Sequence, residues 1–199
     1  PGLFEVLKNH DLRSAMYYGW EPLRDASRPE SLMWADYIHS DSAPDTDVQL
    51  TDRCLWRIRR DKPDFVFLYM VETDEKGGHD NGWMTEAYLN RISIAIDNVR
   101  RVIEACGDEY TVIVTADHGG HDHTHGTADP IDMTIPLFIK TDFELDEKNK
   151  NGLTMAGISY AKEKTLEEIE TVCKTASFII KIIKSFSIKY LSYKHFAKW

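Results

Sequence analysis

The stretch Phe65-Val-Phe-Leu-Tyr-Met-Val71 is a continuous apolar run with the length of a strand. Before it, residues 47–60 place apolar side chains at roughly helical spacing, and Lys62-Pro63-Asp64 separates the two segments. A strand that lacks polar alternation and is reached from a helix is typical of the buried centre of a parallel sheet. The stretch therefore predicts an α/β fold.

Helix-like and strand-like segments continue on both sides of this run. Residues 2–10 and 85–107 have apolar side chains at helical spacing. Residues 13–18, 110–115 and 135–139 have the apolar character of strands. Residues 21–44 hold several prolines and predict an irregular loop with one short helix near Leu32. We expect a three-layer α/β sandwich with a mostly parallel central sheet and helices on both faces.

The composition changes near residue 140. We predict a partial α/β domain at residues 1–140 and a divergent, helical C-terminal segment at 141–199, whose end is basic and rich in aromatic residues. Lys181, Lys184 and Lys189 interrupt that end too often for a transmembrane span. No basic leader with an apolar core follows Pro1, so no signal peptide is visible and we expect a cytoplasmic protein.

The charge balance of the chain argues against nucleic acid as a partner. The chain has 33 acidic side chains against 24 Lys and Arg, a formal net charge of −9. Binding to a nucleic-acid polymer relies on clustered basic residues, so an acidic excess argues against that function. Cys54, Cys106 and Cys173 lie far apart and predict buried, reduced thiols rather than a disulfide framework or a thiolate zinc site.

Two polar clusters follow predicted strands, and five of the eight histidines lie between His79 and His125. The first cluster is Glu72-Thr-Asp74-Glu-Lys-Gly-Gly-His79-Asp80, and the second is Thr115-Ala-Asp117-His118-Gly-Gly-His121-Asp-His123-Thr-His125-Gly126. Ligands of α/β sheets bind at the carboxyl ends of strands, and the glycines allow tight loops that turn these side chains inward. Mixed carboxylate and imidazole donors favour zinc, with manganese as the alternative, over calcium or magnesium.

Three motifs together resemble the alkaline phosphatase superfamily. They are Asp74 with a nearby Gly-Gly-His79, then Thr-Ala-Asp117-His118-Gly, and then His125-Gly-Thr with a following Asp and Ile-Pro. The nucleotide pyrophosphatase and type I phosphodiesterase branch is the most similar, from about Leu3 to Ile139. The resemblance implies two divalent metal ions, one held by Asp74, His79 and His125 and the other by Asp117 and His118. It also implies hydrolysis of a small phosphodiester or nucleotide substrate, with His121 and His123 as supporting or substrate-contacting residues.

The sequence departs from the family pattern in three ways. The spacing from Asp74 to His79 is one residue longer than usual, which leaves Glu72 or Glu75 as substitute ligands. The family's Thr or Ser nucleophile follows an apolar strand that is not found here, so we expect it upstream of Pro1 and expect this chain by itself to be inactive. The family's usual closing segment has no match after Lys140.

Two other interpretations remain open. In the first, the chain is a non-catalytic metal-binding or interaction protein derived from the enzyme scaffold. In the second, it belongs to a phosphomonoesterase, sulfatase or phosphoglycerate mutase that shares the same metal ligands.

Overall fold

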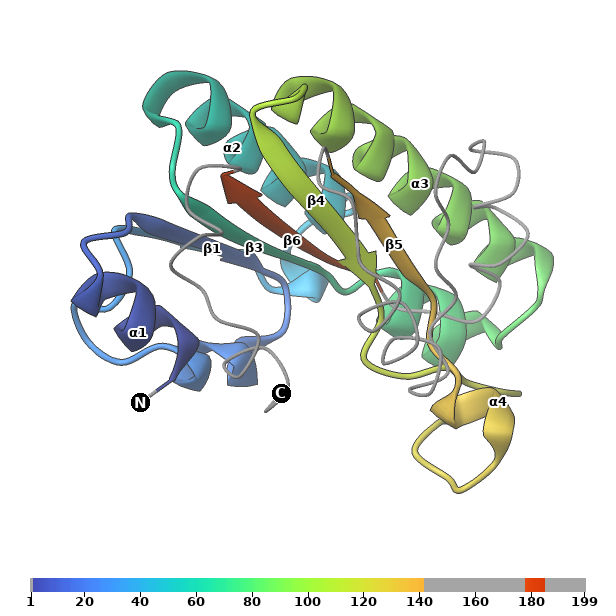
Figure 1. Ribbon diagram of the computed structural model, residues 1–199. Helices are drawn as coiled ribbons and strands as arrows, with labels where there is room; N and C mark the ends of the chain where they lie inside the picture. The colour runs from blue at the N-terminus through green and yellow to red at the C-terminus, as the bar shows by residue number, and fades with distance from the viewer. Residues whose placement is uncertain (1, 142–177, 185–199) are drawn as a thin grey trace, which may run out of the picture.

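Residues 2–141 and 178–184 are described by the computed structural model, and they contain a six-stranded sheet in the order β2-β1-β3-β6-β4-β5 (Figure 1). The strands are β1 (Ser14–Tyr18), β2 (Trp34–Tyr37), β3 (Phe65–Met70), β4 (Tyr110–Thr115), β5 (Leu137–Lys140) and β6 (Phe178–Lys184). The helices are α1 (Leu3–Asn9), α2 (Thr46–Asp61), α3 (Glu86–Cys106) and α4 (Pro130–Met133). Short 3-10 helices span Glu21–Ala26 and Ser40–Ser42, and a π-helical turn spans Thr73–His79.

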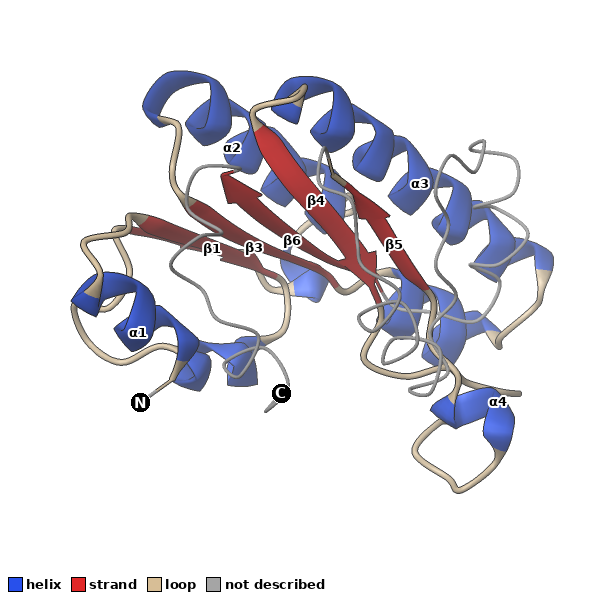
Figure 2. Cartoon of the chain, viewed as in Figure 1, coloured by secondary structure: helices blue, strands red, loops and turns tan. Residues whose placement is uncertain are grey.

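The predicted α/β sandwich is confirmed. Strands β2, β1 and β3 pair in parallel, and β4 points the same way because β6 lies antiparallel to both β3 and β4. Helices α2 and α3 cover one face of the sheet and α1 covers the other (Figure 2). The carboxyl ends of β3 and β4 therefore meet at one edge, which is where the two polar clusters begin.

The sheet is mostly but not wholly parallel, and two local predictions were wrong. Strand β5 is antiparallel to β4, because the loop and single turn of helix between them provide no crossover helix. Residues 178–184 were expected to be helical but form β6, in keeping with the strand preference of their four isoleucines. Strand β2 replaces part of the predicted loop, and the helix expected near Leu32 is absent from that position. The remainder of the predicted C-terminal segment, including Cys173, lies outside the described residues, so the proposed boundary near residue 140 stays a prediction.

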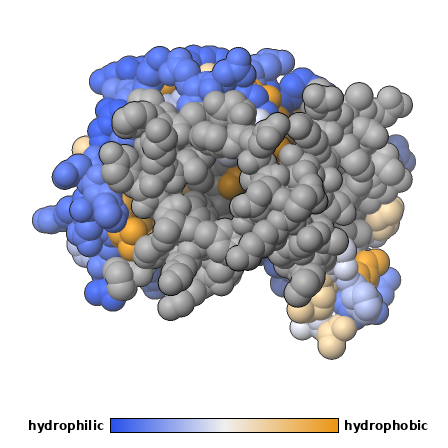
Figure 3. Space-filling model, viewed as in Figure 1, coloured by the Kyte–Doolittle hydropathy of each residue, from blue (hydrophilic) through white to orange (hydrophobic). Residues whose placement is uncertain are grey.

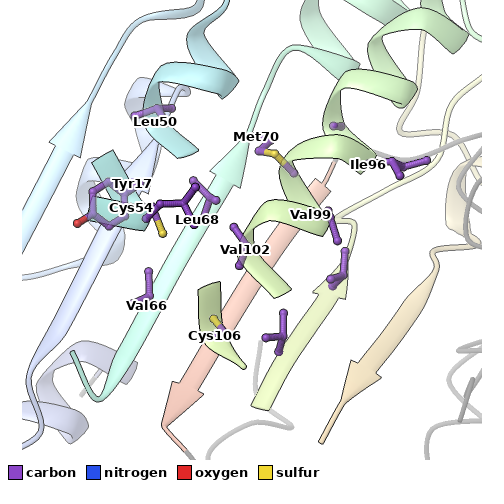
Figure 4. Close-up of a cluster of buried hydrophobic side chains, with 14 of the residues drawn as sticks. Tyr17, Leu50, Cys54, Val66, Leu68, Met70, Ile96, Val99, Val102 and Cys106 are labelled. Carbon is purple, nitrogen blue, oxygen red and sulfur yellow. The ribbon is translucent and has the colours of Figure 1, made fainter. Parts of the chain in front are cut away.

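The main core lies between the sheet and the pair α2 and α3. Its side chains include Leu50 from α2, Leu68 from β3 and Ile96 and Val99 from α3, all almost fully buried (Figure 4). A second cluster on the other face packs α1 against β1 and β3. Cys54 and Cys106 are free and buried, as predicted.

The N-terminus of α2 is tied to the end of β3 by two buried carboxylates. Asp47 accepts hydrogen bonds from the backbone N–H groups of Val71 (2.8 Å) and Glu72 (3.0 Å), and Glu72 accepts one from the N–H of Thr46 (3.0 Å). Burial raises the pKa of Asp47 to about 7, with the charge of Glu72 as a second cause. Lys76 lies 2.5 Å from Glu72 and partly balances this charge. These bonds fix the point at which β3 ends and the first polar cluster starts.

Helix α3 begins and ends as its sequence predicts. The Thr85 hydroxyl accepts a hydrogen bond from the N–H of Tyr88, and Gly107 follows the last turn. Within the described ranges, no helix has the length and apolar character needed to cross a membrane. Exposed Ile131 and Met133 lie on α4, in the region where hydrophobic atoms appear at the lower right of Figure 3.

Truncation of a core side chain should destabilise the fold. Ile96→Ala removes a side chain that is 1% exposed, and we expect the free energy of unfolding to fall by about 2–5 kcal/mol. Ser93→Ala, on the exposed face of the same helix, is the matched control and should change it by about 0.5 kcal/mol or less. Urea unfolding followed by circular dichroism measures both, and equal midpoints for the two variants would contradict the assigned core face.

Candidate metal centre

The first cluster is organised by the π-helical turn at Thr73–His79. A π-helix bonds residue i to residue i+5, as the bond from the N–H of Gly77 to the carbonyl of Glu72 does at 2.9 Å. Asp74 and His79 are also five apart, so the turn brings their side chains together, and Asp74 Oδ1 lies 3.8 Å from His79 Nε2. The wide turn thus accommodates the five-residue spacing from Asp74 to His79. Glu72 faces Lys76 and Arg91 instead of the histidines.

The second cluster brings two more imidazoles to the same carboxylate. His118, directly after β4, has its Nε2 3.9 Å from Asp74 Oδ1 and 3.8 Å from Asp117 Oδ1. His125 Nε2 lies 3.8 Å from Asp74 Oδ1, and its ring stacks on that of His118 with 3.7 Å between centroids. The structure thus gathers Asp74, His79, His118 and His125 around one point, with Asp117 joined to them through His118.

Asp74 is the centre of this arrangement and has the environment of a metal ligand. It is 8% exposed, and its Oδ1 atom has no hydrogen-bond donor among the described residues. Burial raises the pKa of Asp74, while His118, His79 and His125 act in the opposite direction. Ligand atoms of Asp74, His118 and His125 all lie within 4.8 Å of one another. A buried, unpaired oxygen facing imidazole nitrogens fits a divalent cation, because a cation satisfies all of these atoms at once.

Backbone carbonyls set the tautomers of two of these histidines. His79 Nδ1 lies 3.1 Å from the carbonyl oxygen of His123, and His118 Nδ1 lies 2.7 Å from that of Gly119. A carbonyl oxygen only accepts, so each Nδ1 carries a hydrogen, which leaves Nε2 as the ring nitrogen that faces Asp74. Burial and the neighbouring His118 lower the pKa of His125, which favours a neutral ring.

Trp83 joins the two loops. Its buried ring is so close to Gly78 and Gly120 that a Cβ atom at either position would lie 2.3 Å or 2.2 Å from a ring carbon. The backbone N–H of Trp83 donates to the carbonyl of Asp122 at 2.7 Å, and the ring lies edge-on to His79. Glycine is therefore required at one point in each loop so that the indole can pack between them.

Tyr69 was not identified from the sequence as a site residue. Its hydroxyl donates to Asp117 Oδ2 at 3.2 Å, and burial, followed by the charge of Asp117, raises its pKa so that it remains a donor. The available signal was one hydroxyl in an otherwise apolar strand, one residue before the strand ends.

His121 and His123 do not face Asp74 in the way the other three histidines do. His123 Nδ1 donates to the carbonyl of His79 at 2.9 Å, which completes a reciprocal pair of bonds between the two loops. His121 Nδ1 lies 2.8 Å from Asp132 Oδ1. The hydrogen bond to Asp132 raises the pKa of His121. Burial opposes ionisation of Asp132, but hydrogen bonds from Thr127 and His121 outweigh it and lower the pKa of Asp132 to about 2.

Comparison with known proteins gives one match. The family model described as the Metalloenzyme superfamily matches residues 26–172, which is more than half of the chain and includes both polar clusters. No curated protein and no solved structure matches this sequence.

The contact between Trp83 and Gly120 can be tested by overpacking. Gly120→Ala places a methyl group against the indole, and we expect a loss of about 1–3 kcal/mol in the free energy of unfolding. Trp83→Phe in the same chain provides space, so the double variant should recover part of that loss. Urea unfolding of both single variants and the double variant measures the coupling. Simple addition of the two losses would show that the indole is not what the methyl group meets.

The pairing of His121 with Asp132 predicts a pH dependence. The raised pKa of His121 means that its contribution to stability is complete below 6.5 and is lost as the pH rises through the folded value. The lowered pKa of Asp132 means that its contribution is present above 3.8 and is lost as the pH falls toward about 2. The pair should therefore be strongest between pH 3.8 and 6.5.

A histidine NMR titration checks this prediction. The pKa of His121 should lie above 6.5 and should fall in Asp132→Asn, whereas His10, exposed at the end of α1, serves as an internal reference. An unchanged His121 pKa in Asp132→Asn would contradict the pairing.

Proposed function

The chain belongs to the Metalloenzyme superfamily, part of the alkaline phosphatase-like group, and from this we propose that it carries the metal centre of a hydrolase that cleaves phosphodiester or pyrophosphate bonds. The observation that carries the proposal is the buried oxygen of Asp74, which has no hydrogen-bond donor and faces His79, His118 and His125 at 3.8–3.9 Å. The nucleotide pyrophosphatase and phosphodiesterase branch is supported by the order of the sequence motifs.

Two divalent ions fit the donor set under this proposal. Asp74, His79 and His125 would hold one ion, and Asp117 and His118 would contribute to the other. His118 Nε2 lies 3.9 Å from Asp74 Oδ1 and 3.8 Å from Asp117 Oδ1, and this closeness to both carboxylates supports two adjacent ions. Imidazole and carboxylate donors together favour zinc first and manganese second.

Divalent ions supply charge stabilisation of the attacking and leaving oxygens of a phosphoryl group. The residues of the chain support this in defined ways. The carbonyls of His123 and Gly119 keep the Nδ1 atoms of His79 and His118 protonated, so that their Nε2 atoms face the centre. The hydroxyl of Tyr69 orients Asp117 by donating to its Oδ2 atom, which leaves Oδ1 on the side of His118.

The proposal predicts metal binding that depends on these side chains. Wild-type protein should bind Zn²⁺, and Asp74→Asn and His125→Ala should each weaken binding by at least about 100-fold, because loss of a ligand exceeds the typical loss for a supporting residue. His10→Ala, an exposed histidine outside the site, is the matched control and should bind as wild type does. Isothermal titration calorimetry, with metal content by mass spectrometry, measures binding.

Hydrolysis assays then address the reaction. The zinc- or manganese-loaded protein is assayed with bis(p-nitrophenyl) phosphate, p-nitrophenyl phosphate and p-nitrophenyl sulfate, since these separate a phosphodiesterase from a phosphomonoesterase and a sulfatase. Turnover of the diester that is lost in Asp74→Asn supports the proposal. No nucleophile was identified in the sequence, so metal binding with no turnover of any substrate fits both the proposed hydrolase centre and a non-catalytic metal-binding protein on the same scaffold. Absence of metal binding would overturn both.

A further inference from the structure

His125 differs from the other candidate ligands in its place in the fold. Asp74 and His79 belong to the π-helical turn that follows β3, and Asp117 and His118 come directly after β4. His125 lies in the middle of the long loop between β4 and α4, so no strand end holds it in place. Its position therefore depends on whatever shapes that loop.

One buried carboxylate binds this loop on both sides of His125. Asp132, on α4, is 1% exposed. Its Oδ1 atom accepts from His121 Nδ1 at 2.8 Å, and its Oδ2 atom accepts from the backbone N–H and the hydroxyl of Thr127 at 2.8 and 2.7 Å. His121 precedes His125 by four residues and Thr127 follows it by two, so the carboxylate spans the segment that carries the ligand.

Backbone contacts hold the same segment at Asp132. The N–H of Gly119 donates to the carbonyl of Asp132 at 2.7 Å, and a Cβ atom at Gly119 would lie 2.0 Å from the carbonyl oxygen of Ile131, so only glycine permits this approach. Within the loop, His121 and Thr124 exchange backbone hydrogen bonds at 3.0 and 2.9 Å. The loop is thus hydrogen-bonded to α4 at its start, through Gly119. It is also bonded to the Asp132 side chain before and after His125, through His121 and Thr127.

From this geometry we propose that Asp132 is a positioning residue that holds His125 stacked on His118 and facing Asp74. This inference rests on the proposed metal centre for its importance, but the structural effect on His125 is separate from metal binding. His121 and Thr127 are the two contacts through which Asp132 acts, which gives His121 a supporting role in place of a substrate contact.

The carboxylate is required because all three of its partners are donors. In Asp132→Asn, one oxygen becomes an NH₂ group. If it faces Thr127, it opposes the backbone N–H of that residue, and if it faces His121, the bond persists only when Nδ1 becomes the acceptor. Asp129 offers a matched control on the same segment. Its side chain is exposed and, among the described residues, accepts only the local bond from the N–H of Ile131 at the start of α4, at 2.9 Å. Asp129→Asn makes the same chemical change without altering the side-chain bonds to His121 and Thr127.

The experiment compares Asp132→Asn with Asp129→Asn in the full chain. In the metal-free protein, long-range ¹H–¹⁵N NMR spectra record the ring resonances of His118 and His125, which are sensitive to the 3.7 Å stack. We expect both rings to shift in Asp132→Asn and neither to shift in Asp129→Asn. Zn²⁺ titration should show affinity reduced by about 10–100-fold in Asp132→Asn alone, the usual effect of losing a supporting residue.

Two further variants separate positioning from a general loss of structure. His121→Asn keeps a side-chain N–H close to the place of Nδ1 and should retain more Zn²⁺ affinity than His121→Ala. Thr127→Val removes one hydroxyl donor and leaves the backbone bond, so it provides a milder test if Asp132→Asn does not fold.

The outcomes distinguish this inference from the proposed function. Unchanged His118 and His125 resonances and unchanged Zn²⁺ affinity in folded Asp132→Asn or Thr127→Val would overturn the positioning role. If wild-type protein binds no Zn²⁺ but the two rings still shift in Asp132→Asn, the proposed function fails and the positioning role stands. Equal effects in Asp129→Asn would also overturn it, because the change would then not depend on the loop contacts.

Discussion

The oxygen atom Asp74 Oδ1 is the constraint on which the rest of the site depends. It is removed from water, receives no hydrogen bond within the described part of the chain, and is approached by the Nε2 atoms of three histidines. Burial of a carboxylate without a partner is costly in a folded protein, and such a cost is tolerated where it serves a function. A bound cation would remove this cost, because it would satisfy the oxygen and the facing Nε2 atoms together.

The remaining structure can be understood as the support for this arrangement. Asp47 and Glu72 join α2 to the end of β3 and so fix the start of the π-helical turn. Trp83 packs between Gly78 and Gly120 and so holds together the two loops that carry the candidate ligands. The backbone carbonyls of one loop select the tautomer of a histidine in the other. Several of these supports act on His79, which lies in the π-helical turn, packs against Trp83 and bonds to the carbonyl of His123.

The support also explains why the two glycine pairs are placed as they are. Gly78 allows the indole of Trp83 to approach the first loop, and Gly120 does the same for the second, while Gly119 permits the contact with Ile131. The glycines in these motifs are thus required for packing between the loops as much as for turning the chain. That reason was not visible from either motif considered separately.

Local sequence was sufficient to predict the elements whose signals are strong and local. The apolar run that became β3, the capped helix α3 and the two polar clusters at strand ends were all identified, because periodicity, capping and apolar runs act over a few residues. Tertiary contacts decided the strand pairing, the strand directions and the side-chain contacts between distant segments. Strand β2 forms because β1 offers it an edge, β5 runs antiparallel because its connection is short, and Asp132 reaches His121 and Thr127 only when α4 folds against the loop. The sequence by itself thus determined the fold class and the candidate ligands. The tertiary structure alone decided which atoms meet, because hydrogen bonds between distant loops leave no periodic signal in the chain.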